Sequence, residues 1–247
     1  MASNSETGHA KNVANFEQLT IDCTALGTSY NPSNAAIKST ALATLLTNAK
    51  NAVAAVNAAH AAYSNAVAAR EVGFDPLSKL TTRVMNALKA SGTTVQVDES
   101  AQTLVRKLQG RRATAKLTPD EKKAAEAAGK TVTEISSSQM SYDNRLDNFD
   151  KLIKLLTSVT LYAPNEADLK VTALTATYTD LKTKNTAVVN ADTALTNARI
   201  ARNVVMYAAN TGLVDISVDV KTYVKSILGA TSPQYKQVSA LKFTSHN

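Results

Sequence analysis

An alanine-rich stretch from Asn31 to Phe74 constrains the fold of this chain more than any other feature. Alanine has the highest intrinsic helix propensity, and neither glycine nor proline occurs between Ser33 and Val72. We therefore predict one unbroken helix of roughly 40 residues, which would be about 60 Å long. Asn31 and Pro32 suit its start, because asparagine caps first-turn N–H groups and proline needs no hydrogen-bond donor there.

The larger apolar side chains of this stretch recur at alternating spacings of three and four, as in a heptad repeat. They are Leu42, Leu46, Ala49, Val53, Val56, Tyr63 and Val67, with His60 in the same series. We call this series the seam. A single helix cannot bury such a seam alone, so the pattern predicts a coiled-coil-like contact with another long helix.

The chain itself carries a second long helix, because the stretch recurs at a constant offset of 132 residues. Tyr30-Asn31-Pro32 is echoed by Tyr162-Ala163-Pro164, and the match persists to Arg70 and Arg202. The segment before the long helix also recurs, at an offset of 133, because Asn15-Phe16 is matched by Asn148-Phe149. The second seam carries Leu174, Tyr178, Leu181, Val188, Leu195 and Met206. Each copy is thus expected to contain a helix, a long helix and two short helices.

These patterns predict an all-α fold, an elongated helical bundle built from two tandem copies around a pseudo-two-fold axis. We expect a disordered tail at 1–10, a first helical repeat at 11–110, a basic polar linker at 111–140 and a second repeat at 141–247. Within the linker, Thr118-Pro119-Asp120-Glu121 has the form of a helix start, so this segment is expected to contain at most a short helix. The two repeats are expected to pack as one domain, with two half-domains as the alternative.

The number of cysteines and the hydropathy pattern indicate in which cellular compartment the protein is expected. Cys23 is the single cysteine, so no disulfide can form within the chain, as is usual in reducing compartments. The N-terminal residues have neither the basic nor the apolar region of a secretory signal. No apolar run approaches the ~18 residues of a membrane span. We therefore expect a cytoplasmic protein without a transmembrane segment.

Three features of the sequence together resemble a known family. They are the duplication with a proline before each long helix, the run Arg-Lys-Leu-Gln-Gly-Arg-Arg-Ala-Thr-Ala-Lys at 106–116, and Thr-Ser-Pro-Gln-Tyr-Lys-Gln-Val-Ser at 231–239. The chain resembles, over most of its length, a family of uncharacterised, internally duplicated helical proteins associated with Bacteroidetes. The resemblance implies one complete helical unit, and it implies no activity, cofactor or catalytic residue.

The two seams differ at positions that could carry chemistry. His60 is matched by Asp192, and Val53 is matched by Asn185. If the long helices pack antiparallel and cross at their middles, His60 and Asp192 would form a buried polar pair, in which each group shifts the pKa of the other. A catalytic or pH-responsive pair is one interpretation. A structural contact that fixes register, or two solvated positions, is the simpler one, and Asn185 is open to the same two interpretations.

Motifs of the common enzyme and metal-binding classes are missing from the sequence. There is no cysteine pair, no His-Glu-x-x-His, no glycine-rich phosphate loop and no Gly-x-Ser-x-Gly. Cys23 occupies an apolar helical position without a basic partner, which favours packing over nucleophilic chemistry. We therefore predict a protein that is not an enzyme and uses neither cofactor nor metal.

Positive charge is concentrated in the predicted linker. The formal net charge is +7, and residues 106–130 hold eight basic and three acidic side chains. A polyanion could be contacted by Arg106, Lys107, Arg111, Arg112 and Lys116. No aromatic residues lie among these charges, so stacking on nucleic-acid bases is not supported, and a solvated linker is the simpler interpretation.

The sequence therefore favours a structural or scaffolding protein that self-assembles as a homo-oligomer. The alternative hypothesis is a nucleic-acid or polyanion-binding protein that uses residues 105–130. A carrier of a small ligand, with a pocket between helices, is a third hypothesis.

Overall fold

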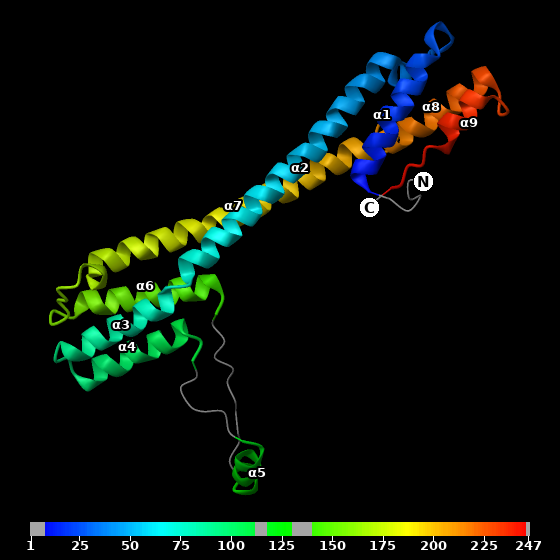
Figure 1. The fold of residues 1–247 in the computed structure, drawn as a ribbon. Coiled ribbons are helices and arrows are strands. Elements are labelled where there is room, and N and C mark those ends of the chain that lie inside the picture. Colours follow the sequence, from blue (N-terminus) through cyan, green and yellow to red (C-terminus); the bar gives the residue numbers. More distant parts are fainter. Residues whose placement is uncertain (1–7, 112–117, 130–139, 246–247) are drawn as a thin grey trace. The chain divides into compact units, whose positions relative to one another are not determined.

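The computed structural model describes residues 8–111, 118–129 and 140–245. The α-helices are α1 (His9–Ala25), α2 (Ser39–Phe74), α3 (Leu77–Ala90), α4 (Val95–Leu108), α5 (Pro119–Ala127), α6 (Tyr142–Ser158), α7 (Val171–Tyr207), α8 (Leu213–Leu228) and α9 (Pro233–Ala240) (Figure 1). Short 3-10 helices lie at η1 (Gly27–Ser29), η2 (Ala35–Ile37) and η3 (Ala167–Leu169). No strand occurs in these three ranges, and the helices other than α5 pack together as a bundle, so the all-α prediction is confirmed.

The first long helix begins later than predicted. Helix α2 starts at Ser39 rather than at Asn31, because the chain first makes the single 3-10 turn η2. The side chain of Asn34 caps this turn by accepting from the N–H of Ala36. Lys38 then adopts an extended conformation, which separates the turn from the long helix. A local cap thus overrides the high helix propensity of this stretch.

A short helix, α5, forms within the predicted linker, and it begins at the helix start that the sequence indicates at Thr118-Pro119. The Thr118 side chain accepts from the N–H of Glu121, and the Glu121 carboxylate accepts in return from the Thr118 N–H, which is a capping box. The rest of the predicted linker at 112–117 and 130–139, and residues 1–7 of the predicted tail, lie outside the described residues.

The chain divides into two compact units that do not follow the predicted repeats. The terminal unit comprises the described residues of Met1–Ser64 and Ala191–Asn247, and the central unit comprises those of Asn65–Asn190. Each unit therefore takes helices from both predicted repeats, and the boundaries expected at 110 and 141 are not unit boundaries. The reason is the length of α2. A helix of 36 residues is about 54 Å long, so the helices before and after it cannot share one core.

The core of the terminal unit forms where α1 packs against α8 and α9. Helix α1 contributes Val13, Phe16, Leu19 and Cys23, which recur at spacings of three and four on its buried face. They pack with Leu42 and Ala49 of α2, Met206 of α7, and Leu213, Ile216, Val220 and Val224 of α8. Burial of these side chains at roughly 25 cal/mol per Å² is the main stabilising contribution.

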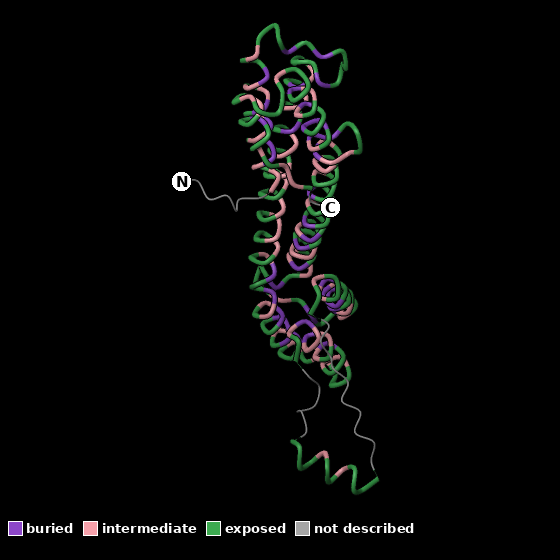
Figure 2. Tube along the Cα trace, turned by 90° about the vertical axis from the view of Figure 1, so that its right-hand side faces the viewer, coloured by how far each residue is buried: buried purple, intermediate pink, exposed green. Residues whose placement is uncertain are grey.

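The core of the central unit forms where α4 packs against α3 and α6. It contains Phe74, Leu77, Val84, Leu88, Ala101, Val105, Leu108, Phe149, Leu152, Leu156, Leu174 and Leu181. Figure 2 shows that buried residues, in purple, gather where the shorter helices pack on the long ones. Each unit thus has its own apolar core.

The same local contact occurs before both long helices. The hydroxyl of Tyr30 donates to the carbonyl of Ile37 at 2.6 Å, and that of Tyr162 donates to the carbonyl of Leu169 at 2.8 Å. Both tyrosines are buried, and each contact closes one of the 3-10 turns η2 and η3. The offset of 132 residues seen in the sequence is therefore repeated in hydrogen-bond geometry.

Removing one of these hydroxyls should weaken its unit. In Tyr162→Phe the buried carbonyl of Leu169 loses its donor, and we expect the free energy of unfolding to fall by about 1–3 kcal/mol. Urea denaturation followed by circular dichroism measures this change. Tyr178→Phe is the control, because Tyr178 packs half-buried against the same core. Equal losses in the two variants would contradict a role for the hydrogen bond.

The same tyrosine should make stability depend on alkaline pH. Burial, followed by the nearby carboxylates of Glu166 and Asp168, raises the pKa of Tyr162 from 10.0 to about 12. The folded state therefore holds this proton more tightly than the unfolded state. Its contribution is complete below pH 10 and is lost as the pH rises from 10 to about 12. The stability difference between the wild type and Tyr162→Phe should shrink across that window in urea titrations, and a constant difference would refute this linkage.

Candidate ligand cavity

The polar pair predicted on the seams is not buried. His60 on α2 and Asp192 on α7 both belong to the terminal unit, and both side chains are exposed to solvent. The buried side chains of α2 lie toward its two ends, at Leu42, Ala49 and Phe74, and its residues 50–73 include no buried position. The prediction of a buried His60–Asp192 pair is therefore wrong, and the alternative of two solvated positions describes them.

Asn185 is the seam position where a polar group is buried. Its side chain is 8% exposed and lies in the central unit. Its Oδ1 accepts from Nη1 of Arg70 at 3.2 Å, and its Nδ2 donates to Oδ1 of Asp143 at 2.8 Å. The Arg70 guanidinium also lies 4.0 Å from the ring centroid of Tyr142. We call these four side chains the polar cluster.

A second arginine beside the polar cluster has a structural role. Arg145 donates from Nη2 to the carbonyl of Phe74 at 2.9 Å, and its guanidinium lies 5.0 Å from the Phe74 ring. Phe74 is the last residue of α2, so this bond satisfies one of the carbonyl groups that a helix end leaves without a partner. Burial lowers the pKa of Arg145, and its Nε, like that of Arg70, has no hydrogen-bond partner among the described residues.

The described part of the basic segment lies at the end of α4. Arg106 and Lys107 occupy its last turn, where positive charge stabilises the helix dipole, and Arg106 also donates to Thr103. Arg111 is exposed, and its backbone N–H donates to the Arg106 carbonyl. Arg112 and Lys116 lie outside the described residues. The predicted polyanion contacts are thus not assembled into one described site.

The cysteine is a packing residue. Cys23 is 1% exposed in the core of the terminal unit. Burial raises the pKa of its thiol to about 11, an effect that a hydrogen bond with Tyr30 opposes. A thiol with this pKa is protonated at neutral pH, so it lacks the reactive thiolate form.

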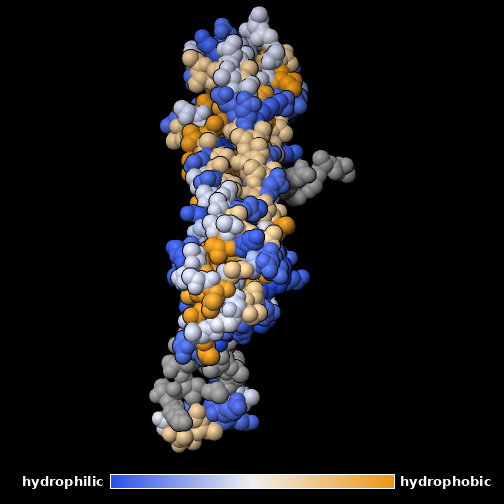
Figure 3. All heavy atoms as spheres, turned by 90° about the vertical axis from the view of Figure 1, so that its left-hand side faces the viewer, coloured by the Kyte–Doolittle hydropathy of each residue, from blue (hydrophilic) through white to orange (hydrophobic). Residues whose placement is uncertain are grey.

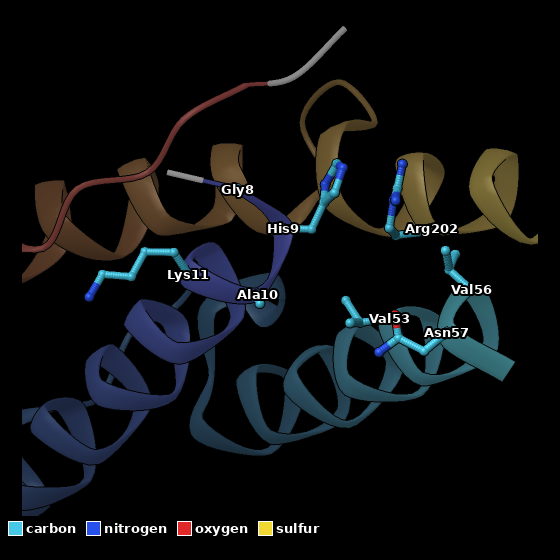
Figure 4. Close-up of a pocket in the computed structure, with 8 residues that line it drawn as sticks. All are labelled: Gly8, His9, Ala10, Lys11, Val53, Val56, Asn57 and Arg202. Carbon is cyan, nitrogen blue, oxygen red and sulfur yellow. The ribbon is translucent and has the colours of Figure 1, made fainter. Parts of the chain in front are cut away.

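A cavity of about 290 Å³ opens in the terminal unit, at the N-terminal end of α1. Its lining comes from three helices: Gly8, His9, Ala10 and Lys11 at the start of α1, Val53, Val56 and Asn57 of α2, and Arg202 of α7. In Figure 4 the His9 and Arg202 side chains extend in the same direction, while the Lys11 ammonium is directed away from them. The cavity therefore combines an apolar floor, formed by Val53 and Val56, with a basic wall, formed by His9 and Arg202.

Hydrogen bonds hold the basic wall in place. Nδ1 of His9 and the hydroxyl of Tyr207 share a hydrogen bond of 2.7 Å. Arg202 donates from Nε and Nη2 to Oδ1 of its neighbour Asn203, at 3.2 and 2.9 Å. Arg202 thus has a neutral acceptor, and in the part of the chain that the structure describes no carboxylate pairs with it.

Sequence reasoning missed this cavity, although a signal was available. Each of its eight lining residues lies 132 or 133 positions away in the sequence from a residue of the polar cluster or from a neighbour of that cluster in the sequence. At these offsets Ala10 corresponds to Asp143, and Val53 corresponds to Asn185. A comparison of the two copies side chain by side chain would have shown that one arginine keeps its polar partners and the other does not.

The described ranges contain no group of three or more His, Cys, Asp or Glu side chains placed to hold a metal ion. In these ranges we also find no helix with the length and apolarity needed to cross a bilayer.

The polar cluster should contribute measurably to stability. Replacing Asn185 with Val, the residue at the corresponding position 53, leaves Arg70 and Asp143 without their shared partner. We expect a loss of about 1–3 kcal/mol in the free energy of unfolding, measured by urea denaturation. Thr186→Val is the control, since it introduces the same side chain at an exposed position of the same helix. An Asn185→Val loss no larger than that of the control would contradict this role.

Comparison with known proteins adds no relative. No family model, no curated protein and no solved structure matches this chain. The resemblance to a family of helical proteins from Bacteroidetes therefore stays a prediction.

Proposed function

We propose that this chain is a non-enzymatic structural protein, a helical building block that associates with copies of itself. The observation that carries the proposal is the incomplete burial of the first seam. Leu42 and Ala49 are buried, but Val53, Val56 and Tyr63 are only half-buried within the terminal unit. A heptad-like series that its own chain leaves partly open to solvent can be covered by another helix of the same kind.

Exposed side chains on α7 support the same proposal. Ile200 is 59% exposed and Val204 is 60% exposed, and the two lie one helical turn apart. They point away from Leu195 and Met206, which face the core from the opposite side of the helix. Large aliphatic side chains adjacent on one outward face are a feature of association surfaces.

The exposed surface of α2 is alanine-rich. Exposed alanines of α2 in the terminal unit are Ala54, Ala55, Ala58, Ala61 and Ala62. Figure 3 shows a stripe of moderately apolar, tan atoms along the upper part of the visible face, with stronger apolar groups, in orange, beside it. Small side chains allow a partner helix to approach closely, which suits contact between copies.

No described contact favours the alternative of polyanion binding. Arg106 and Lys107 already have a structural role at the end of α4. The two hypotheses also differ in their dependence on salt. Copies that each carry a formal charge of +7 repel one another, so added salt should strengthen self-association, whereas it weakens binding to a polyanion.

Charged substitutions on α7 test the proposal. The wild type should show larger species by sedimentation velocity as protein concentration and salt rise. The double variant Ile200→Lys with Val204→Lys should weaken association by at least about tenfold, because burying one such side chain is worth about 1.5–3 kcal/mol. Both positions are exposed, so the monomer should keep its helical content and its melting temperature.

The matched control adds the same charge elsewhere on the helix. Ala194→Lys with Ala201→Lys places two lysines at exposed positions roughly 100° around α7 from Ile200. This control should associate like the wild type. A wild type that stays monomeric at every concentration and salt, or equal effects of the two double variants, would refute the proposal.

A further inference from the structure

Two arginines at corresponding positions of the long helices have different surroundings. Arg70 of α2 and Arg202 of α7 are separated by the offset of 132 residues that relates the two copies. In the central unit, Arg70 donates to Asn185, and Asn185 donates in turn to the Asp143 carboxylate. The guanidinium is thus linked through an amide to a negative charge of its own chain.

The terminal unit lacks both of these polar partners. Ala10 occupies the position of Asp143, and Val53 occupies the position of Asn185. Both residues line the cavity together with Arg202. The side chains that complete the polar cluster in one unit are therefore replaced by smaller or apolar ones in the other, beside open volume. Among the described residues, Arg202 donates to the side chain of Asn203, which is uncharged.

The start of α1 adds to the positive character of the cavity. In the central unit, the Ser141 side chain caps α6 by accepting from the N–H of Asn144. The corresponding residue before α1 is Gly8, which has no side chain to do so. Gly8 therefore supplies no side-chain cap at the start of α1, beside Arg202 and His9, and a helix N-terminus favours an anion.

We propose that this cavity is a binding site for a small organic carboxylate. The Arg202 guanidinium holds the carboxylate, in place of the polar partners that Arg70 finds within the chain. Val53 and Val56 contact a short aliphatic chain on the same ligand. The volume of about 290 Å³ lies at the lower end of the range for ligand pockets, which suits a ligand of a few heavy atoms.

Sodium butyrate is the probe, because it joins a carboxylate to a three-carbon chain. Protein-observed NMR at constant ionic strength follows the methyl signals of Val53 and Val56 and the Nε–Hε signal of Arg202. We expect saturable shifts with a dissociation constant on the order of 1 mM, as befits a ligand of six heavy atoms. Arg202→Gln should weaken binding by at least about tenfold.

Two further variants separate the site from general effects of charge and stability. Arg70→Gln removes the same charge from the corresponding position and should leave butyrate binding unchanged, because that guanidinium already has its partners. Ala10→Asp with Val53→Asn gives the terminal unit the aspartate and asparagine of the polar cluster, so binding should be lost while the thermal melt stays cooperative.

Three results would overturn the proposal. The first is the absence of saturable shifts at Val53 and Val56 in the folded wild type. The second is undiminished butyrate binding in both Arg202→Gln and the Ala10→Asp with Val53→Asn variant. The third is inorganic phosphate binding as tightly as butyrate at matched ionic strength, which would show that the aliphatic chain contributes nothing.

Discussion

The length of α2 and α7 is the constraint on which the rest of the structure depends. Each long helix has 36 or 37 residues, whereas α1 and α6 have 17 residues each. A short helix can cover only part of a long one, so apolar side chains are buried where short helices pack. In α2 these are Leu42 and Ala49 near one end and Phe74 at the other. Two cores form for this reason, and each recruits helices from both halves of the sequence.

The hydrogen bonds just before the two long helices are more alike than the contacts along those helices. Tyr30 and Tyr162 close their 3-10 turns by the same hydroxyl-to-carbonyl bond. These contacts join residues only seven positions apart, so they depend on the local sequence alone. The polar cluster instead joins α2, α6 and α7, and the corresponding positions in the terminal unit hold Ala10 and Val53 in place of two of its polar members. The two units thus differ most in contacts between helices, and there the terminal unit has a cavity.

The two proposals overlap at one part of the terminal unit. Self-association involves the half-buried seam of α2 together with Ile200 and Val204 of α7, whereas the carboxylate site lies against Val53, Val56 and Arg202. Either could fail without the other. Val53 and Val56 belong both to the half-buried seam and to the cavity floor, so a partner helix that covered the seam there would compete with a ligand.

The sequence by itself determined the helices and their local starts. Alanine content and the absence of glycine and proline predicted α2, and Thr118 and Glu121 predicted the start of α5, because propensity and capping act within a few residues. Even at this level the start of α2 was placed too early, since the Asn34 cap and the extended Lys38 are small local effects that propensity does not reveal.

Only the tertiary structure decided which helices share a core and which polar residues are buried. Periodicity placed His60, Asp192 and Asn185 on equivalent seams, yet the first two are exposed and only Asn185 is buried. The difference arises because burial depends on which helix lies opposite, and Asn185 meets Arg70 and Asp143 there. The cavity beside Arg202 follows from the same cause. Its residues come from three helices whose approach the sequence pattern does not specify.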